Sequence, residues 1–146
     1  MLSNKAKYAL KALMYLIEHR ERTQIPIGEI AEAENIPRKF LDAILLTLRK
    51  HGYLASAMGK AGGYRFARAP DSITVGEIIR VLDGPLAPIP CASRTAYRPC
   101  ADCADVETCH VRLVMLDARD AIALVLDSTT LVQMHTKGGE PSKLLT

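Results

Sequence analysis

Residues 30–68 read IAEAENIPRKFLDAILLTLRKHGYLASAMGKAGGYRFAR, and this stretch decides the fold. Apolar residues recur in it every three or four positions over about 37–51, which predicts an amphipathic helix. Its predicted inward face consists of Phe40, Leu41, Ile44, Leu45 and Leu48. Gly52 can take the left-handed conformation that ends a helix. Two strand-like runs, 53–57 and 64–67, then flank a glycine-rich tip, which predicts a β-hairpin.

The flanking sequence extends this pattern in both directions. Residues 3–19 predict an amphipathic helix, residues 27–33 a short one, and residues 74–82 a helix opened by Thr74 with Glu77 three positions later. Helix, short helix, helix and glycine-rich hairpin follow one another in the order typical of a winged helix-turn-helix. The expected fold class is therefore mainly α with a small β-hairpin wing, followed by a long C-terminal dimerisation helix.

That long helix is expected over about 106–127. Five residues on it step by 4, 3, 4 and 3, as in a coiled-coil seam: Val111, Met115, Ala118, Ile122 and Val125. The same face could equally pack on the protein's own core. The expected organisation is a winged helix-turn-helix domain over 1–84, a cysteine-rich loop over 85–110, a dimerisation helix region over 106–135 and a flexible tail over 136–146.

Composition places the chain among small globular proteins. It has 146 residues, of which 49% are hydrophobic and 24% charged. There is no apolar run of membrane-spanning length and no signal-peptide pattern, so a cytoplasmic location is expected. The four histidines are dispersed, and the glycine-rich segment lies between strands instead of opening a helix. These features argue against an enzyme.

Charge is distributed unevenly along the chain. Residues 1–70 contain 12 Lys and Arg against 6 Asp and Glu, whereas residues 71–146 contain 7 against 10. The basic half carries the predicted reading helix, with Arg38, Lys39 and Asp42 near its N-terminal end, and the hairpin tip carries Lys60. Such an arrangement favours DNA as the partner. A winged helix that binds another protein is the alternative.

All four cysteines of the chain fall within 19 residues: Cys91, Cys100, Cys103 and Cys109. The loop around them has few bulky apolar side chains, so something other than hydrophobic burial must organise it. Thiolates are ligands for iron–sulfur clusters and for zinc, and the spacing does not separate these two. Reversible thiol–disulfide chemistry is a third reading.

Residues 30–68, the run ITVGEIIRVLDGPL that follows at 73–86, and the cysteine loop before a long helix together resemble the Rrf-type winged-helix transcription regulators, the family of IscR, NsrR and CymR. The resemblance implies a homodimer that binds a palindromic DNA operator. By position, Tyr8, Lys39 and Asp42 fall where relatives contact DNA, and Lys60 falls in the wing. The predicted DNA-binding residues are Lys5, Tyr8, Arg38, Lys39, Asp42, Lys60 and Arg65. Many relatives have an arginine where this chain has Met58.

The resemblance also implies an iron–sulfur cluster in this loop, of either the 2Fe–2S or the 4Fe–4S type, with zinc less favoured. Either Cys91, Cys100, Cys103 and Cys109 all bind the cluster, or three of them bind it and one serves as a redox thiol. The spacing departs from the usual family pattern of three cysteines separated by five and five residues. Relatives with a histidine ligand place it three residues after the last cysteine, where this chain has Arg112. Redox change, nitric oxide or iron loss would then alter operator affinity.

Overall fold

The computed structural model describes residues 2–59 and 62–139. Its elements are α1 (Asn4–Glu18), α2 (Ile27–Ala33), α3 (Arg38–Lys50), β1 (Leu54–Ala57), β2 (Gly63–Phe66), η1 (Pro70–Ser72), α4 (Val75–Asp83), η2 (Pro90–Ala92), α5 (His110–Ser128) and α6 (Leu131–Gly138). A mainly helical chain with one two-stranded hairpin confirms the predicted fold class. No helix within the described ranges is long and apolar enough to cross a membrane.

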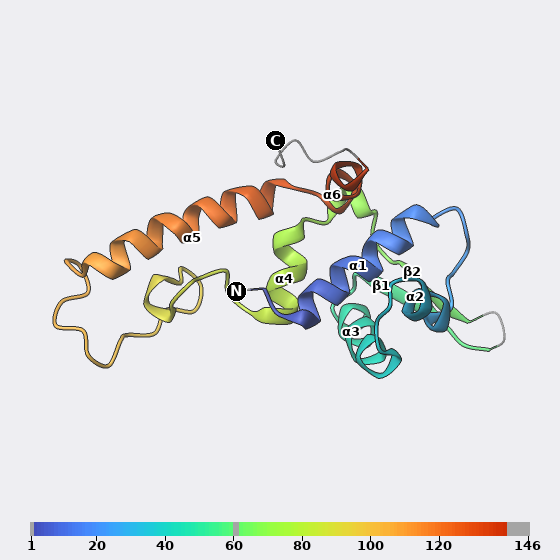
Figure 1. Ribbon diagram of the computed structural model, residues 1–146, viewed down its shortest axis with the longest axis horizontal. Coiled ribbons are helices and arrows are strands. Elements are labelled where there is room, and N and C mark those ends of the chain that lie inside the picture. The colour runs from blue at the N-terminus through green and yellow to red at the C-terminus, as the bar shows by residue number, and fades with distance from the viewer. Residues whose placement is uncertain (1, 60–61, 140–146) are drawn as a thin grey trace.

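One hydrophobic core lies among α1, α2, α3 and α4, and the C-terminal helix α6 covers part of it (Figure 1). Its fully buried large side chains come from six elements and the segments between them: Leu13, Leu16, Ile30, Leu41, Ile44, Leu45, Leu48, Leu54, Ile73, Ile78 and Leu131. Side chains cap the first turns of α1 and α4, the latter as predicted from the sequence. The Ser3 hydroxyl accepts the Ala6 N–H, and Thr74 and Glu77 form a reciprocal capping box at the start of α4.

The hairpin pairs Leu54 with Phe66 and Ala57 with Gly63 in an antiparallel register. Its second strand is also tied to the segment before α2, because Ile25 and Tyr64 exchange two backbone hydrogen bonds of 2.9 Å. Gly63 has φ +156°, and a side chain there would collide with the Ile25 carbonyl. Glycine at this position therefore lets the tip end of β2 lie against the segment before α2.

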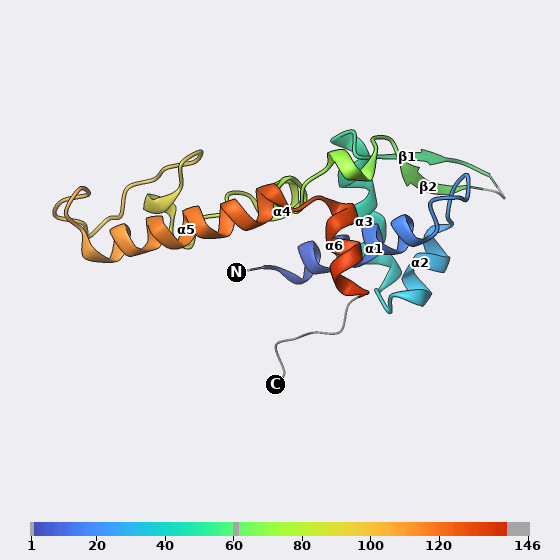
Figure 2. The same ribbon diagram turned by 90° about the horizontal axis from the view of Figure 1, so that it is seen from above.

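α5 leaves the body as a long arm, and the hairpin projects at the opposite end of the molecule (Figures 1 and 2). The C-terminal end of α5 is fastened to α4 at both ends of α4. The Val75 N–H donates to the Thr129 carbonyl at 2.9 Å, and Arg80 forms a bidentate ion pair with Asp127 at 2.6 and 2.8 Å. Orientation of the arm is therefore coupled to the helical body.

The C-terminal helix differs from the prediction in two ways. α5 begins at His110 instead of 106, because the Asp105 carboxylate accepts the Glu107 N–H and closes a separate turn. The region up to 135 holds two helices, since Thr130 caps a new helix with Gln133. α6 then runs to Gly138, past the predicted start of the tail at 136, while residues 140–146 lie outside the described residues.

Candidate functional site

The N-terminal turn of α3 carries exposed charged side chains. Arg38 and Lys39 in this turn are exposed, as is Asp42 in the next turn, and the first turn contains no acidic residue. Pro37 occupies the N-cap position without a side-chain hydrogen bond, so the helix N–H groups are not covered by a cap. Free N–H groups and the positive end of the helix dipole attract phosphate. This turn can therefore contact a nucleic-acid backbone while Asp42 offers an acceptor to a base edge.

Phe40 was predicted to face the core, and that prediction is wrong: the residue is 63% exposed. Leu41, Ile44, Leu45 and Leu48 form the buried face. Each residue of an α-helix advances about 100°, so Phe40 lies about a quarter-turn from the centre of that face. Spacing alone places Phe40 one turn before Ile44, which is why the sequence pattern included it.

The other predicted DNA contacts lie on α1 and the hairpin. Lys5 is exposed, Tyr8 is half-buried, and Arg65 is exposed on β2. Lys60 lies outside the described residues. Met58, which stands where many relatives carry arginine, is 98% exposed at the end of β1. The predicted DNA-contact positions and the neighbouring Met58 therefore include both charged and apolar side chains.

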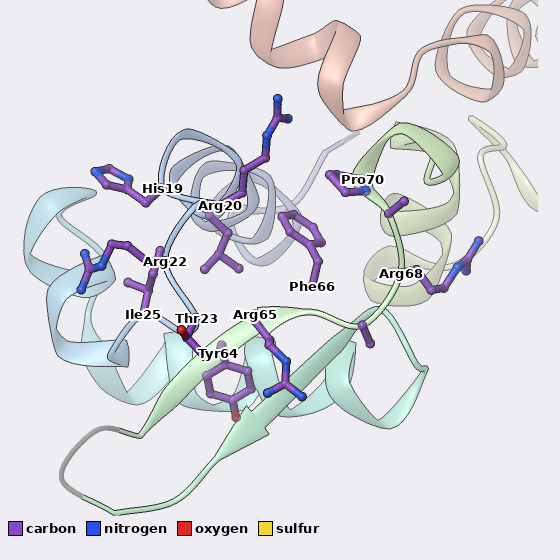
Figure 3. Close-up of a pocket in the computed structure, with 13 residues that line it drawn as sticks. His19, Arg20, Arg22, Thr23, Ile25, Tyr64, Arg65, Phe66, Arg68 and Pro70 are labelled. Atoms are coloured by element: carbon purple, nitrogen blue, oxygen red, sulfur yellow. The ribbon is translucent and has the colours of Figure 1, made fainter.

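A hollow of about 390 Å³ lies between the end of α1 and β2, with Leu16, Ile25 and Phe66 among its lining residues. Arginines surround it, but Figure 3 shows their guanidinium groups pointing outward in different directions. Arg22 is bound to Glu29 at 2.6 and 3.0 Å, and Arg68 lies 3.6 Å from Glu77. Since these cations do not converge, the hollow is not built to hold an anion.

The cysteines lie on the segment that leaves η2 and returns at the start of α5. Cys91 is buried within η2, Cys100 is exposed, and Cys103 and Cys109 are half-buried, with Cys109 as the N-cap residue of α5. The Cys103 N–H donates to the Cys100 carbonyl at 3.4 Å, which closes a tight turn within the C-x-x-C motif. The fold thus fixes Cys91 and Cys109 on regular structure and carries Cys100 and Cys103 on the loop between them.

The loop thiols influence one another's protonation. The Cys100 thiol donates to the Asp102 carboxylate at 2.7 Å, and this hydrogen bond raises the pKa of Cys100. Partial burial raises the pKa of Cys103, and the adjacent Cys109 and the more distant Cys91 add to the effect. Thiols with a raised pKa hold their protons at neutral pH, so a metal that binds them must displace those protons.

Arg112 ties the two ends of the cysteine loop together. Its Nε donates to the Cys91 carbonyl at 2.9 Å, and its Nη1 donates to the Val106 carbonyl at 3.2 Å. A guanidinium with several fixed donors suits such bridging of two carbonyls. From the sequence, Arg112 stands out only because some relatives have a histidine at this position, whereas in the structure it braces η2, the loop and α5 together.

A second brace joins the loop to the middle of α5. Arg94 binds Asp120 through two hydrogen bonds of 2.8 and 2.6 Å, and Arg119 adds a third at 3.0 Å. The two guanidinium groups hold the pKa of the Asp120 carboxyl far below its usual range. This pairing could not be read from the sequence, because Arg94 and Asp120 are 26 positions apart.

The four thiols suit a soft metal or an iron–sulfur cluster in chemical kind. They are not gathered for it, because no three His, Cys, Asp or Glu side chains of residues 2–59 and 62–139 form a metal-binding group. Cys109 adds to the rise in the pKa of Cys103 that burial causes, so these two thiols lie near each other, whereas the Cys100 thiol donates to Asp102. The four thiols are therefore suitable ligands for a metal or cluster. To bind it, the loop whose two ends Arg112 joins would have to close around it.

Comparison with protein families gives one matching model, described as Rrf2, an iron-dependent transcriptional regulator, over residues 2–137. A putative HTH-type transcriptional regulator, rrf2-like, from Rhodobacter capsulatus is 43% identical over 99% of each chain. The HTH-type transcriptional regulator CymR of Bacillus subtilis is 32% identical over 89% of this chain and 86% of its own.

Solved structures agree with this fold. The structure of CymR, the global cysteine regulator of B. subtilis, matches 94% of this chain and 97% of its own with a TM-score of 0.76 and 31% identity. IscR of T. potens matches 100% of this chain and 93% of its own with a TM-score of 0.74 and 29% identity. The named functions among these matches are those of transcriptional regulators and not of enzymes.

Proposed function

The chain belongs to the Rrf2 family of transcriptional regulators, and from this premise we propose that it is a homodimer whose affinity for operator DNA is controlled by an iron–sulfur cluster on the cysteine loop. Residues 1–84 would read DNA, residues 85–110 would hold the cluster, and α5 would join two copies. The connection from the loop through α5 to α4 is the observation that carries the proposal.

A series of side-chain and backbone contacts links the cysteine loop to the helices of the proposed DNA-binding domain. Arg94 and Arg112 fasten the loop to α5, and Asp127 with the Thr129 carbonyl fastens α5 to α4. α4 in turn packs on α1 and α3. A change in how the cysteines are held would therefore shift α5, and with it the spacing of the two α3 helices in a dimer. The cluster can change operator affinity by no more than the difference between its binding free energies for the two conformations of the protein.

Cys91, Cys100, Cys103 and Cys109 would be the ligands. A cluster bound there supplies sensitivity to redox state, iron supply or nitric oxide. Asp102 and Arg112 would have separate roles. Asp102 accepts a hydrogen bond from the Cys100 thiol and so keeps it protonated until the cluster binds, whereas Arg112 fixes the Cys91 backbone. The iron-dependent description of the family model agrees with this choice of cofactor.

A thiol switch is the second candidate, favoured by the nearness of Cys109 to Cys103. A peroxide could oxidise these two thiols to one disulfide, with two electrons and two protons passing to the peroxide to give water. A related CymR, that of Staphylococcus aureus, has been solved in an oxidised form. Zinc held by the same four thiolates would give a colourless protein instead.

Single cysteine-to-serine variants separate these candidates. With a cluster, each of C91S, C100S, C103S and C109S is expected to lower bound iron and sulfide, measured after anaerobic reconstitution, and to change operator affinity. With a Cys103–Cys109 disulfide, only C103S and C109S remove the response to peroxide, and iron stays absent throughout. Wild-type iron and sulfide content in all four variants would exclude these cysteines as ligands.

Replacing Arg112 by alanine is expected to loosen the loop. Losing two hydrogen bonds to carbonyls should expose the buried Cys91, raising its rate of alkylation by iodoacetamide roughly tenfold. Site-specific labelling rates are measured by mass spectrometry. R98A is the matched control, because Arg98 lies exposed on the same loop. Equal Cys91 labelling in R112A and wild type would show that Arg112 does not hold this segment.

A further inference from the structure

α3 carries a row of apolar groups beside its charged residues. Phe40 is 63% exposed, Ala43 is exposed, and Thr47 is half-buried. Positions i, i+3 and i+7 lie one above another on a helix, so these three side chains form a single strip. The strip lies next to Lys39, which is also exposed.

Thr47 contributes its methyl group to this strip. Its hydroxyl donates to the Ala43 carbonyl at 2.9 Å, so its polar atom is already satisfied within the helix. From the N-terminal turn onward, the strip therefore presents the phenyl ring of Phe40, the methyl of Ala43 and the methyl of Thr47. Phe40, at the N-terminal end, is the largest and the most exposed of the three groups.

In the major groove, thymine alone carries an apolar group on its edge, the C5-methyl, and alanine, threonine and phenylalanine are side chains that contact it. The N-terminal residues of a recognition helix are those that reach the base edges. We propose that α3 selects operator sequence by packing Phe40, with Ala43 beside it, against thymine methyl groups. This inference rests on the proposed function, since it requires α3 to enter the major groove.

Lys39 and Asp42 would then have different tasks from Phe40. A lysine that binds phosphate positions the helix without reading sequence, and a carboxylate accepts from a cytosine amino group. Phe40 can do neither, because it has no polar atom. Its contribution should therefore appear only at thymines, and only through the methyl group.

The test removes that methyl and nothing else. An operator is first selected from a random DNA library with the full-length protein. Each thymine is then replaced by uracil at the symmetric positions of both half-sites, and affinity is measured by fluorescence anisotropy. Burial of one methyl-sized group corresponds to about a fourfold change, so one symmetric pair of replacements should weaken wild-type binding about 16-fold.

The F40A variant is expected to bind the thymine and uracil operators equally. K39A is the matched control on the same turn: it should bind both more weakly and keep the wild-type ratio between them. F40L keeps an apolar group and should retain part of the ratio. Circular dichroism checks that F40A is folded, as expected for a side chain outside the core.

Three outcomes overturn the proposal, and they differ in whether the proposed function also fails. If an operator is recovered but no thymine position shows a methyl effect that F40A abolishes, Phe40 does not read thymine, while the proposed function stands. A methyl effect unchanged in F40A leads to the same conclusion. If no DNA sequence is recovered from the library, the proposed function fails and this inference fails with it.

Discussion

Replacing Ile122 and Val125 together by aspartate on α5 is expected to give monomers that bind the operator at least about a hundredfold more weakly. Ile122 is 41% exposed and Val125 59%, an unusual exposure for large apolar side chains on one helix face. In a dimer these faces would be buried against each other, where a carboxylate without a partner is strongly unfavourable. A monomer loses the second half-site, whose binding is otherwise intramolecular.

The oligomeric state is measured by sedimentation velocity and the affinity by anisotropy, on the same samples. L124D is the matched control, since Leu124 is 73% exposed and lies on the opposite face of α5. It is expected to leave both measurements unchanged. If the double variant is still a dimer, or if L124D has an equal effect, the dimer interface does not lie at the predicted seam.

Replacing Lys39 and Lys60 by alanine is expected to reduce operator affinity about a hundredfold at physiological salt. A dimer would lose four cation–phosphate contacts, so the slope of log affinity against log salt should become shallower by about 3 to 4. Affinity is measured from low to moderate salt to obtain that slope.

K50A provides the control for the lysine variant. Lys50 is exposed on the same helix as Lys39 but at its C-terminal end, which is not expected to enter the groove. Its loss should alter the salt slope little. Unchanged affinity in the Lys39 and Lys60 variant would show that DNA is bound elsewhere on the protein.

The helical core could be predicted from the sequence because its signals are local. The period of Leu41, Ile44, Leu45 and Leu48 fixed α3 within one residue at each end, and the Thr74–Glu77 pair fixed the start of α4. α6 was missed because its cap, Thr130 with Gln133, follows α5 after a single intervening residue. Apolar spacing alone does not reveal so short a break.

The candidate site was only partly predictable, for two physical reasons. Phe40 lies at the edge of the apolar face, where spacing cannot distinguish burial from exposure. The braces on the cysteine loop join residues far apart in sequence, such as Arg112 with Cys91 and Arg94 with Asp120. Cysteine clustering identified the donors, but the contacts that hold the loop on α5 needed the structure.

The most direct test of the proposed control is to measure metal content and operator affinity on one anaerobic preparation. Iron, sulfide and zinc are quantified, and operator affinity is then measured before and after the iron is removed by a chelator. We expect a brown protein with roughly stoichiometric iron and sulfide, and an operator affinity that changes at least about tenfold when they are lost. A colourless protein after reconstitution, or the same affinity with and without iron, would contradict the proposed control.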